Sequence, residues 1–158
     1  MVVTTMPSTC SILKKLKSDY PKVNFQQADD YLWSPGEKTV YYAENPTDKD
    51  GYAYLLHELS HGLLGHSDYD RDITLIAMER TAWDKAQELA GGYGLTINDE
   101  LVESTLDSYR DWLHARSTCP NCGATGLQTK KLGYSCPACD QKWRVNEARV
   151  CALRRFSI

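Results

Sequence analysis

The most informative stretch of this sequence reads Tyr52-Ala-Tyr-Leu-Leu-His-Glu-Leu-Ser-His-Gly-Leu-Leu-Gly-His66. It places His57 and His61 four residues apart, with Glu58 directly after the first histidine. On an α-helix, residues i and i+4 lie on one face about one turn apart, so both imidazoles can aim at one metal ion. The carboxylate between them can then reach a water molecule bound to that ion. The leucines of the stretch supply the apolar flank of a buried helix, and the pattern predicts a zinc site for hydrolysis.

A catalytic zinc ion usually takes three protein ligands, so one ligand must come from outside this stretch. Glu79 lies on a second predicted helix and faces the same way as Ala82 and Trp83. His66 follows a glycine and can curl back toward the same site. Weaker candidates stand in the loop that follows, and these are Asp68, Asp70 and Asp72. We favour Glu79 as the third ligand because a rigid helix presents a side chain better than a loop does.

Glu58 is the expected general base of this site. A metal ion lowers the pKa of its bound water toward neutrality, and an adjacent carboxylate can accept the proton. A donor for the tetrahedral oxyanion is also expected. His66, Tyr69 and Arg80 are the candidates, and the sequence does not choose among them.

The run His57-Glu-Leu-Ser-His-Gly-Leu-Leu-Gly-His66 resembles the active-site helix of ImmA/IrrE-type zinc metallopeptidases. In that family the third zinc ligand is a downstream helical glutamate in a Glu-x-x-Ala setting, and Glu79-Arg-Thr-Ala82 is similar. The resemblance covers residues from about 20 to 95. It implies an intracellular peptidase that cleaves a specific protein, often a DNA-binding repressor encoded beside it.

Four of the six cysteines form two Cys-x-x-Cys pairs, Cys119 with Cys122 and Cys136 with Cys139. Without an evident secretory signal, such pairs indicate metal binding rather than disulfides, and we expect Cys10 and Cys151 to be reduced thiols. Four thiolates suit a closed tetrahedral zinc site. The sequence therefore predicts a zinc ribbon whose metal is structural, in addition to one catalytic zinc ion.

The charge of the chain is divided unevenly. Residues 1–114 hold 10 Lys and Arg against 19 Asp and Glu, whereas residues 115–158 hold 8 against 2. A basic module suits an anionic partner, so the ribbon is expected to contact DNA or, as the competing use, a protein target. Tyr134 and Trp143 can stack on bases or fill the ribbon core. The residues expected to meet phosphates are Lys130, Lys131, Lys142, Arg144 and Arg149.

The predicted fold class is α+β. Helices are expected at residues 9–20, at the histidine stretch up to the neighbourhood of Gly65, at 73–90 and after Thr96 or Asn98, with an antiparallel sheet over 23–43. The predicted domains are a zincin-like metallopeptidase domain at 1–114, the ribbon at 115–145 and a basic tail at 146–158.

The N-terminus lacks a basic start and an apolar core, and no apolar run spans a membrane, so a cytoplasmic protein with no membrane partner is expected. The sequence also permits two interpretations other than an ImmA/IrrE-type peptidase. A His-Glu-x-x-His domain joined to a ribbon also resembles SprT/Spartan-type proteases, which act on DNA-bound proteins. The other alternative is a non-catalytic regulator whose zinc sites are structural.

Overall fold

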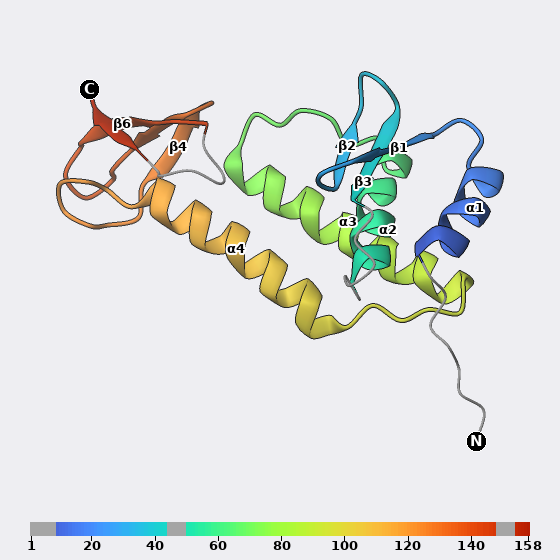
Figure 1. Ribbon diagram of the computed structural model, residues 1–158. Coiled ribbons are helices and arrows are strands. Elements are labelled where there is room, and N and C mark those ends of the chain that lie inside the picture. The colour runs from blue at the N-terminus through green and yellow to red at the C-terminus, as the bar shows by residue number, and fades with distance from the viewer. Residues whose placement is uncertain (1–8, 44–49, 148–153) are drawn as a thin grey trace. The chain divides into compact units, whose positions relative to one another are not determined.

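The computed structural model describes residues 9–43, 50–147 and 154–158, and it has an α+β architecture (Figure 1). Within these residues lie four helices, a small mixed sheet and a second sheet of four antiparallel strands. The chain divides into two compact units, one of residues 1–67 and 81–98 and the other of residues 68–80 and 99–158. Helix α3 (Asp72–Gly92) is continuous and contributes residues to both units.

The sheet of the first unit has the strand order β1-β3-β2. Strand β3 (Thr39–Ala43) lies in the centre, antiparallel to β2 (Leu32–Ser34) and parallel to β1 (Asn24–Ala28). The prediction of an antiparallel sheet over residues 23–43 was therefore wrong for one of its two pairings. Strands β1 and β2 run in opposite directions but do not pair with each other. Strand β3 lies between them and forms hydrogen bonds with both, so one of its pairings is parallel and the other antiparallel.

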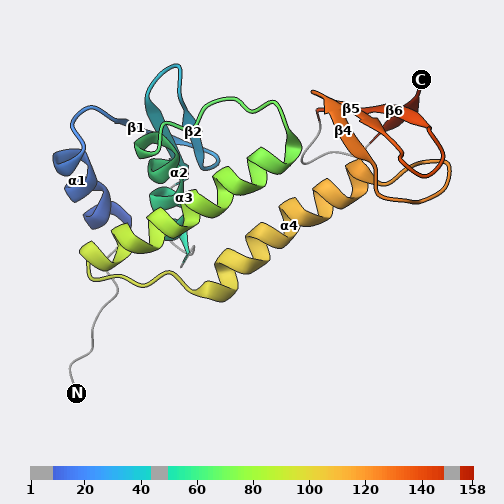
Figure 2. The ribbon, with the colours of Figure 1, turned by 180° about the vertical axis from the view of Figure 1, so that it is seen from behind.

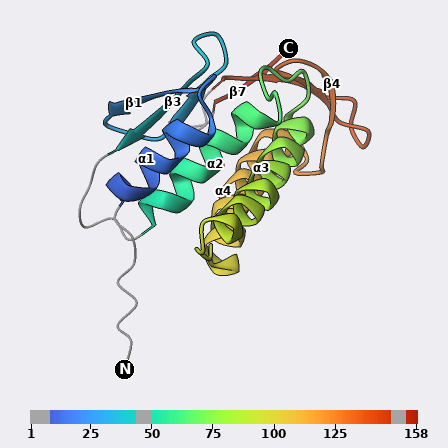
Figure 3. The same cartoon turned by 90° about the vertical axis from the view of Figure 1, so that its right-hand side faces the viewer.

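Helices α1 (Thr9–Asp19) and α2 (Gly51–Leu63) lie side by side against one face of this sheet, as Figure 3 shows. Each helix buries an apolar stripe, because its leucines and isoleucine recur at three- and four-residue spacing. The stripe of α1 consists of Ile12, Leu13 and Leu16, and that of α2 includes Leu55, Leu56 and Leu59. The predicted left-handed residue after α2 is confirmed, since Gly65 has φ +69°.

Strand β2 approaches α2 closely at Gly62. A Cβ atom at this position would lie 3.0 Å from ring carbons of Trp33. The Trp33 indole Nε1 also donates a hydrogen bond to the carbonyl oxygen of His66, at 3.2 Å. The glycine in the histidine stretch thus allows the indole of β2 to lie flat against the helix, and this contact sets where β2 runs relative to the two histidines.

The second unit contains helix α4 (Asp99–Ser117), which leads directly into the strands of the C-terminal sheet (Figure 2). The strands are β4 (Leu127–Lys130), β5 (Gly133–Ser135), β6 (Lys142–Val145) and β7 (Arg155–Ser157), in the order β4-β5-β6-β7. Tyr134 and Trp143 are buried in the core of this sheet, so they fill the core rather than present rings for base stacking. Cys151 and Arg149 lie outside the described residues, as does the side chain of Cys10.

A buried ion pair fixes the first turn of α3 within the second unit. The Arg116 Nε donates to the carboxylate of Asp72 at 2.7 Å, and both side chains are buried. The Tyr134 hydroxyl donates to the same carboxylate. Burial is the larger cause, and this hydrogen bond the smaller, of a raised pKa of Tyr134. The phenol therefore remains a donor at neutral pH. A buried pair of this kind favours one arrangement, because removal of either partner leaves an uncompensated charge.

In the described part of the chain, no helix has the length and apolarity needed to cross a membrane.

We predict that Gly62→Ala lowers the free energy of unfolding by about 1–3 kcal/mol, because the new methyl group displaces the Trp33 ring from well-packed surroundings. Gly91→Ala is the matched control, since a Cβ atom at this helical position meets nothing within 4 Å. It should leave stability unchanged or raise it by up to about 1 kcal/mol. Urea unfolding followed by tryptophan fluorescence measures both. Equal stabilities of the two variants would refute the close approach.

Candidate metal centres

The two histidines of α2 face each other inside the first unit. His57 and His61 are buried, with 5% and 8% of their surfaces exposed. Their Nε2 atoms are 3.1 Å apart, and the rings meet edge to face. Two nitrogens bound to one tetrahedral zinc ion at about 2.0–2.1 Å would be about 3.3 Å apart. The helical spacing therefore brings both Nε2 atoms to the separation that a shared metal ion requires.

Glu79 completes a group of three potential ligands. Nε2 or Nδ1 of each histidine and a carboxylate oxygen of Glu79 all lie within 4.8 Å of one another. The reason is the contact between Trp83 and His57, whose rings are stacked with centroids 4.1 Å apart. Glu79 precedes Trp83 by four residues on the unbroken helix α3, so the two side chains lie on one face. Glu79 is also buried, and a buried carboxylate beside two imidazoles is a donor set suited to zinc.

His66, the alternative third ligand, contacts the outer nitrogen of His61 instead. The Nδ1 atoms of the two rings are 2.9 Å apart, and Nε2 of His66 lies 3.5 Å from the hydroxyl of Thr81. A metal-binding histidine usually donates its other ring N–H to an acceptor, and this fixes its tautomer and orientation. In the tautomer in which Nδ1–H of His61 donates to Nδ1 of His66, Nε2 of His61 would be available to a metal ion.

The loop carboxylates do not enter the group of ligands. Asp72 accepts hydrogen bonds from Arg116 and Tyr134, and Asp68 forms an ion pair with Lys131. The backbone N–H of Tyr69 donates a hydrogen bond to the Asp68 carboxylate. This hydrogen bond is the larger cause, and Lys131 the smaller, of a lowered pKa of Asp68. Among the described residues, the groups that can hold a metal include none of the three loop aspartates.

Glu58 lies at the edge of the same site. One carboxylate oxygen, Oε1, is 4.0 Å from Nε2 of His57, and the other, Oε2, accepts a 2.8 Å hydrogen bond from the backbone N–H of Trp33. The strand thus orients the carboxylate and leaves Oε1 on the ligand side. Of the predicted oxyanion donors, His66 is engaged with His61, and Arg80 forms an ion pair with Glu103.

The contacts of Trp33 with Glu58 and of Thr81 with His66 were not predicted from the sequence. Both contacts join residues far apart in the chain, which no local spacing reveals. The one local indication for Trp33 was its place in an aromatic, strand-prone run ahead of the histidine helix.

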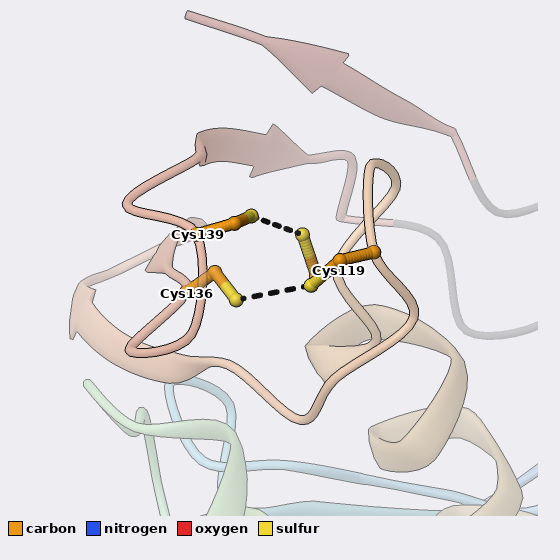
Figure 4. Close-up of side chains that lie close together, drawn as sticks. Cys119, Cys136 and Cys139 are labelled. Atoms are coloured by element: carbon orange, nitrogen blue, oxygen red, sulfur yellow. Dashed lines mark hydrogen bonds between the residues drawn. The ribbon is translucent and has the colours of Figure 1, made fainter.

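The four paired cysteines form the second group of potential ligands (Figure 4). Sγ of Cys119 lies 3.7 Å from Sγ of Cys139, and Sγ of Cys122 lies 3.5 Å from Sγ of Cys136. These separations exceed a disulfide bond of about 2.05 Å. They approach the value of about 3.8 Å for sulfurs bound tetrahedrally to zinc at about 2.3 Å. The cluster is therefore suited to one closed, structural zinc ion.

The two cysteine turns repeat one backbone conformation. The N–H of Gly123 donates to the carbonyl of Cys119, and the N–H of Asp140 donates to that of Cys136, both at 3.0 Å. Gly123 has φ +75° and Asp140 has φ +59°. Glycine adopts such angles without strain, and aspartate tolerates them better than most residues.

The cysteines also show opposed thiol acidities. The side-chain amide of Asn121 donates to Cys139, and mainly for this reason the pKa of Cys139 falls to about 6. The backbone N–H of Ala124 lowers the pKa of Cys122, but contacts with the other three thiols outweigh it and raise that pKa to about 12. Clustered thiols compete for the anionic form, and a cation at their centre would favour all four thiolates.

Comparisons of this chain with protein-family models, with curated proteins and with solved structures found no match. The likeness to a His-Glu-x-x-His zincin site therefore rests on the residues and geometry described above.

We predict that the chain binds two zinc ions, and that His61→Ala and Glu79→Ala each reduce this to one because the ribbon site is untouched. His66→Ala should retain two ions but weaken the histidine site about 10- to 100-fold, since it removes only the orienting contact. Mass spectrometry of metals after dialysis gives the stoichiometry, and competition with a chromogenic chelator gives the affinity.

Glu88→Ala is the control for Glu79→Ala, because Glu88 is an exposed carboxylate on the same helix and should leave both ions bound. A Glu79→Ala protein that keeps two ions, together with a His66→Ala protein that keeps one, would make His66 the third ligand.

Proposed function

We propose that this chain is a zinc-dependent peptidase that hydrolyses a peptide bond in a specific protein target. The observation that supports this most is the convergence of His57, His61 and Glu79, with Oε1 of Glu58 at 4.0 Å from Nε2 of His57. Three protein ligands leave a coordination position open, which is characteristic of catalytic rather than structural zinc. Two histidines and a glutamate suit a metallohydrolase, and the adjacent Glu58 carboxylate offers a proton acceptor.

Zinc bound by these three residues would supply Lewis-acid polarisation of a carbonyl and a water molecule of lowered pKa. Glu58 has the position of a general base, which takes a proton on Oε1 and later delivers it to the leaving amine. The hydrogen bond from Trp33 to Oε2 holds the carboxylate in orientation throughout. His66 acts through His61, whose ring it orients. A tight arrangement of this kind reduces the reorganisation needed during the reaction.

The resemblance to ImmA/IrrE-type peptidases supports a DNA-binding repressor or another regulator as the target. It also supports an intracellular site of action. The histidine helix and the glutamate carry this resemblance, and the ribbon is an addition to it.

A second candidate is a protease that acts on DNA-bound proteins, as SprT-like proteases do. The excess of basic residues in the C-terminal module favours it, since such a module suits an anionic partner. In either case, we propose that the ribbon recruits the catalytic unit to DNA or to a protein target. A non-catalytic regulator is the alternative from another class, and the following experiment separates it from both proteases.

We predict that Glu58→Gln abolishes proteolysis, with a loss of about 10²- to 10⁴-fold, because glutamine keeps the shape of the side chain but cannot accept the proton. The assay incubates the full-length, zinc-loaded protein with a library of peptides from a digested proteome. Mass spectrometry then detects the new termini that depend on Glu58.

Glu88→Gln serves as the control, because it makes the same chemical change on an exposed part of α3. Zinc content is measured in each variant and should remain at two ions. Cleavage that persists in Glu58→Gln at the wild-type rate would exclude the proposed base. The absence of cleavage by the wild type, with both zinc ions bound, would favour the regulator.

A further inference from the structure

The C-terminal sheet presents one face to its core and the opposite face to solvent. In strand β6, Trp143 and Val145 are buried, whereas Lys142 and Arg144 are exposed. Residues directly opposite each other in an antiparallel ladder share a face, so the strand pairing defines which side chains accompany the two exposed cations. Arg144 is paired with Gly133 on one side and with Phe156 on the other.

A bulge in β4 adds a third cation to this outer face. The register shifts between Gln128 and Lys130, so that Lys130 lies opposite Gly133 and Leu127 lies opposite Ser135. A Cβ atom at Gly133 would lie 2.8 Å from Cγ of Lys130, which shows that the lysine stem crosses the glycine. Lys130, Gly133, Arg144 and Phe156 therefore form one row across the four strands.

The surroundings of these three cations differ from those of Lys131 and Arg155 in the described part of the same unit. Among the described residues, no carboxylate forms an ion pair with Lys130, Lys142 or Arg144. Lys131, by contrast, is paired with Asp68 at 3.1 Å, and Arg155 donates to the carbonyl of Thr118. The charges of the outer face are thus available to an external anion.

Exposed apolar side chains lie among these cations. Phe156 is 53% exposed, Leu127 is 62% exposed and Ile158 is 70% exposed. Ile158 follows Phe156 by two residues, and its N–H donates to the carbonyl of Lys142, so both lie on the outer face. We define this outer face by its exposed side chains, Leu127, Lys130, Lys142, Arg144, Phe156 and Ile158.

We propose that the outer face of the ribbon sheet binds single-stranded DNA. Its cations would contact phosphates, and the Phe156 ring would stack on an unpaired base, which is the combination that single-strand-binding surfaces use. A sheet face that carries an aromatic ring cannot reach bases that remain stacked in a duplex. None of the six side chains can accept a hydrogen bond from the 2′-hydroxyl of RNA, and oligouridine is therefore compared with the DNA strand in the test. An acidic protein surface would form ion pairs with the cations but would offer no base for the Phe156 ring to stack on.

This inference replaces Tyr134 and Trp143, which are buried, with Phe156 as the stacking residue. It does not rest on the proposed peptidase activity. The binding test is therefore made with the Glu58→Gln protein as well as the wild type, and a negative result in the peptidase assay leaves it intact.

The experiment measures fluorescence anisotropy of a labelled oligodeoxythymidine of twelve nucleotides with the full-length, zinc-loaded chain. Phe156→Ala should weaken binding at least about fivefold, and Phe156→Tyr should restore it, because stacking needs only the ring. The double variant Lys142→Gln, Arg144→Gln should reduce the slope of log affinity against log salt by about 1.4, which corresponds to two lost phosphate contacts. Lys131→Gln is the control at a cation that is already paired with Asp68, and per charge removed it should reduce the slope less.

Four results would overturn the inference. The first two are no binding of the oligonucleotide, and a change of the salt slope in Lys131→Gln that equals half or more of the change in the double variant. The other two are tighter binding of the duplex or of oligouridine than of the DNA strand, and equal competition by polyglutamate. The last result would assign the surface to an acidic protein. Zinc content of two ions in every variant shows that the ribbon is intact.

Discussion

The stacking of Trp83 on His57 is the contact on which the candidate catalytic site depends. The rings are nearly parallel, with an interplanar angle of 23°, and Tyr54 meets Trp83 edge to face with ring centroids 6.1 Å apart. The indole covers an imidazole face without engaging the nitrogens that must bind a metal. Because α3 is unbroken, the position of Trp83 also fixes the side chain one turn earlier, Glu79. One aromatic contact thus orders the candidate ligand His57 and positions the carboxylate of the candidate ligand Glu79.

Local spacing explains how much of this could be predicted from the sequence. His57 and His61 are four residues apart on one helix, and each cysteine pair lies within one tight turn, so geometry follows almost directly from the chain. The position of Glu79 could also be predicted, because Ala82 and Trp83 mark the buried face of its helix. Contacts between segments far apart in the sequence could not be predicted. The parallel pairing of β1 with β3 and the hydrogen bond from Trp33 to Glu58 depend on which strand occupies the centre of the sheet.

The two candidate metal centres have opposite chemistry. The four thiolates of the ribbon would close the coordination sphere of a zinc ion, and such an ion would add folding energy to a sheet whose own core is small. Two imidazoles and a carboxylate leave the other sphere open, beside a base held by a backbone hydrogen bond. The sequence showed that the ribbon is basic. Among the described residues, Lys131 forms an ion pair with Asp68, whereas the strand register places Arg144 opposite Phe156 on the outer face. The structure thus shows which basic residues of the module lie together on the outer face of the sheet.

The most direct test of the central claim is anomalous diffraction at the zinc edge from crystals of the full-length chain. The account predicts two anomalous peaks. One should lie among Nε2 of His57, Nε2 of His61 and the carboxylate of Glu79, with Nδ1 of His66 still against His61, and the other among the four sulfurs. A single peak at the cysteines, or a second peak coordinated by His66 with Glu79 turned away, would contradict it.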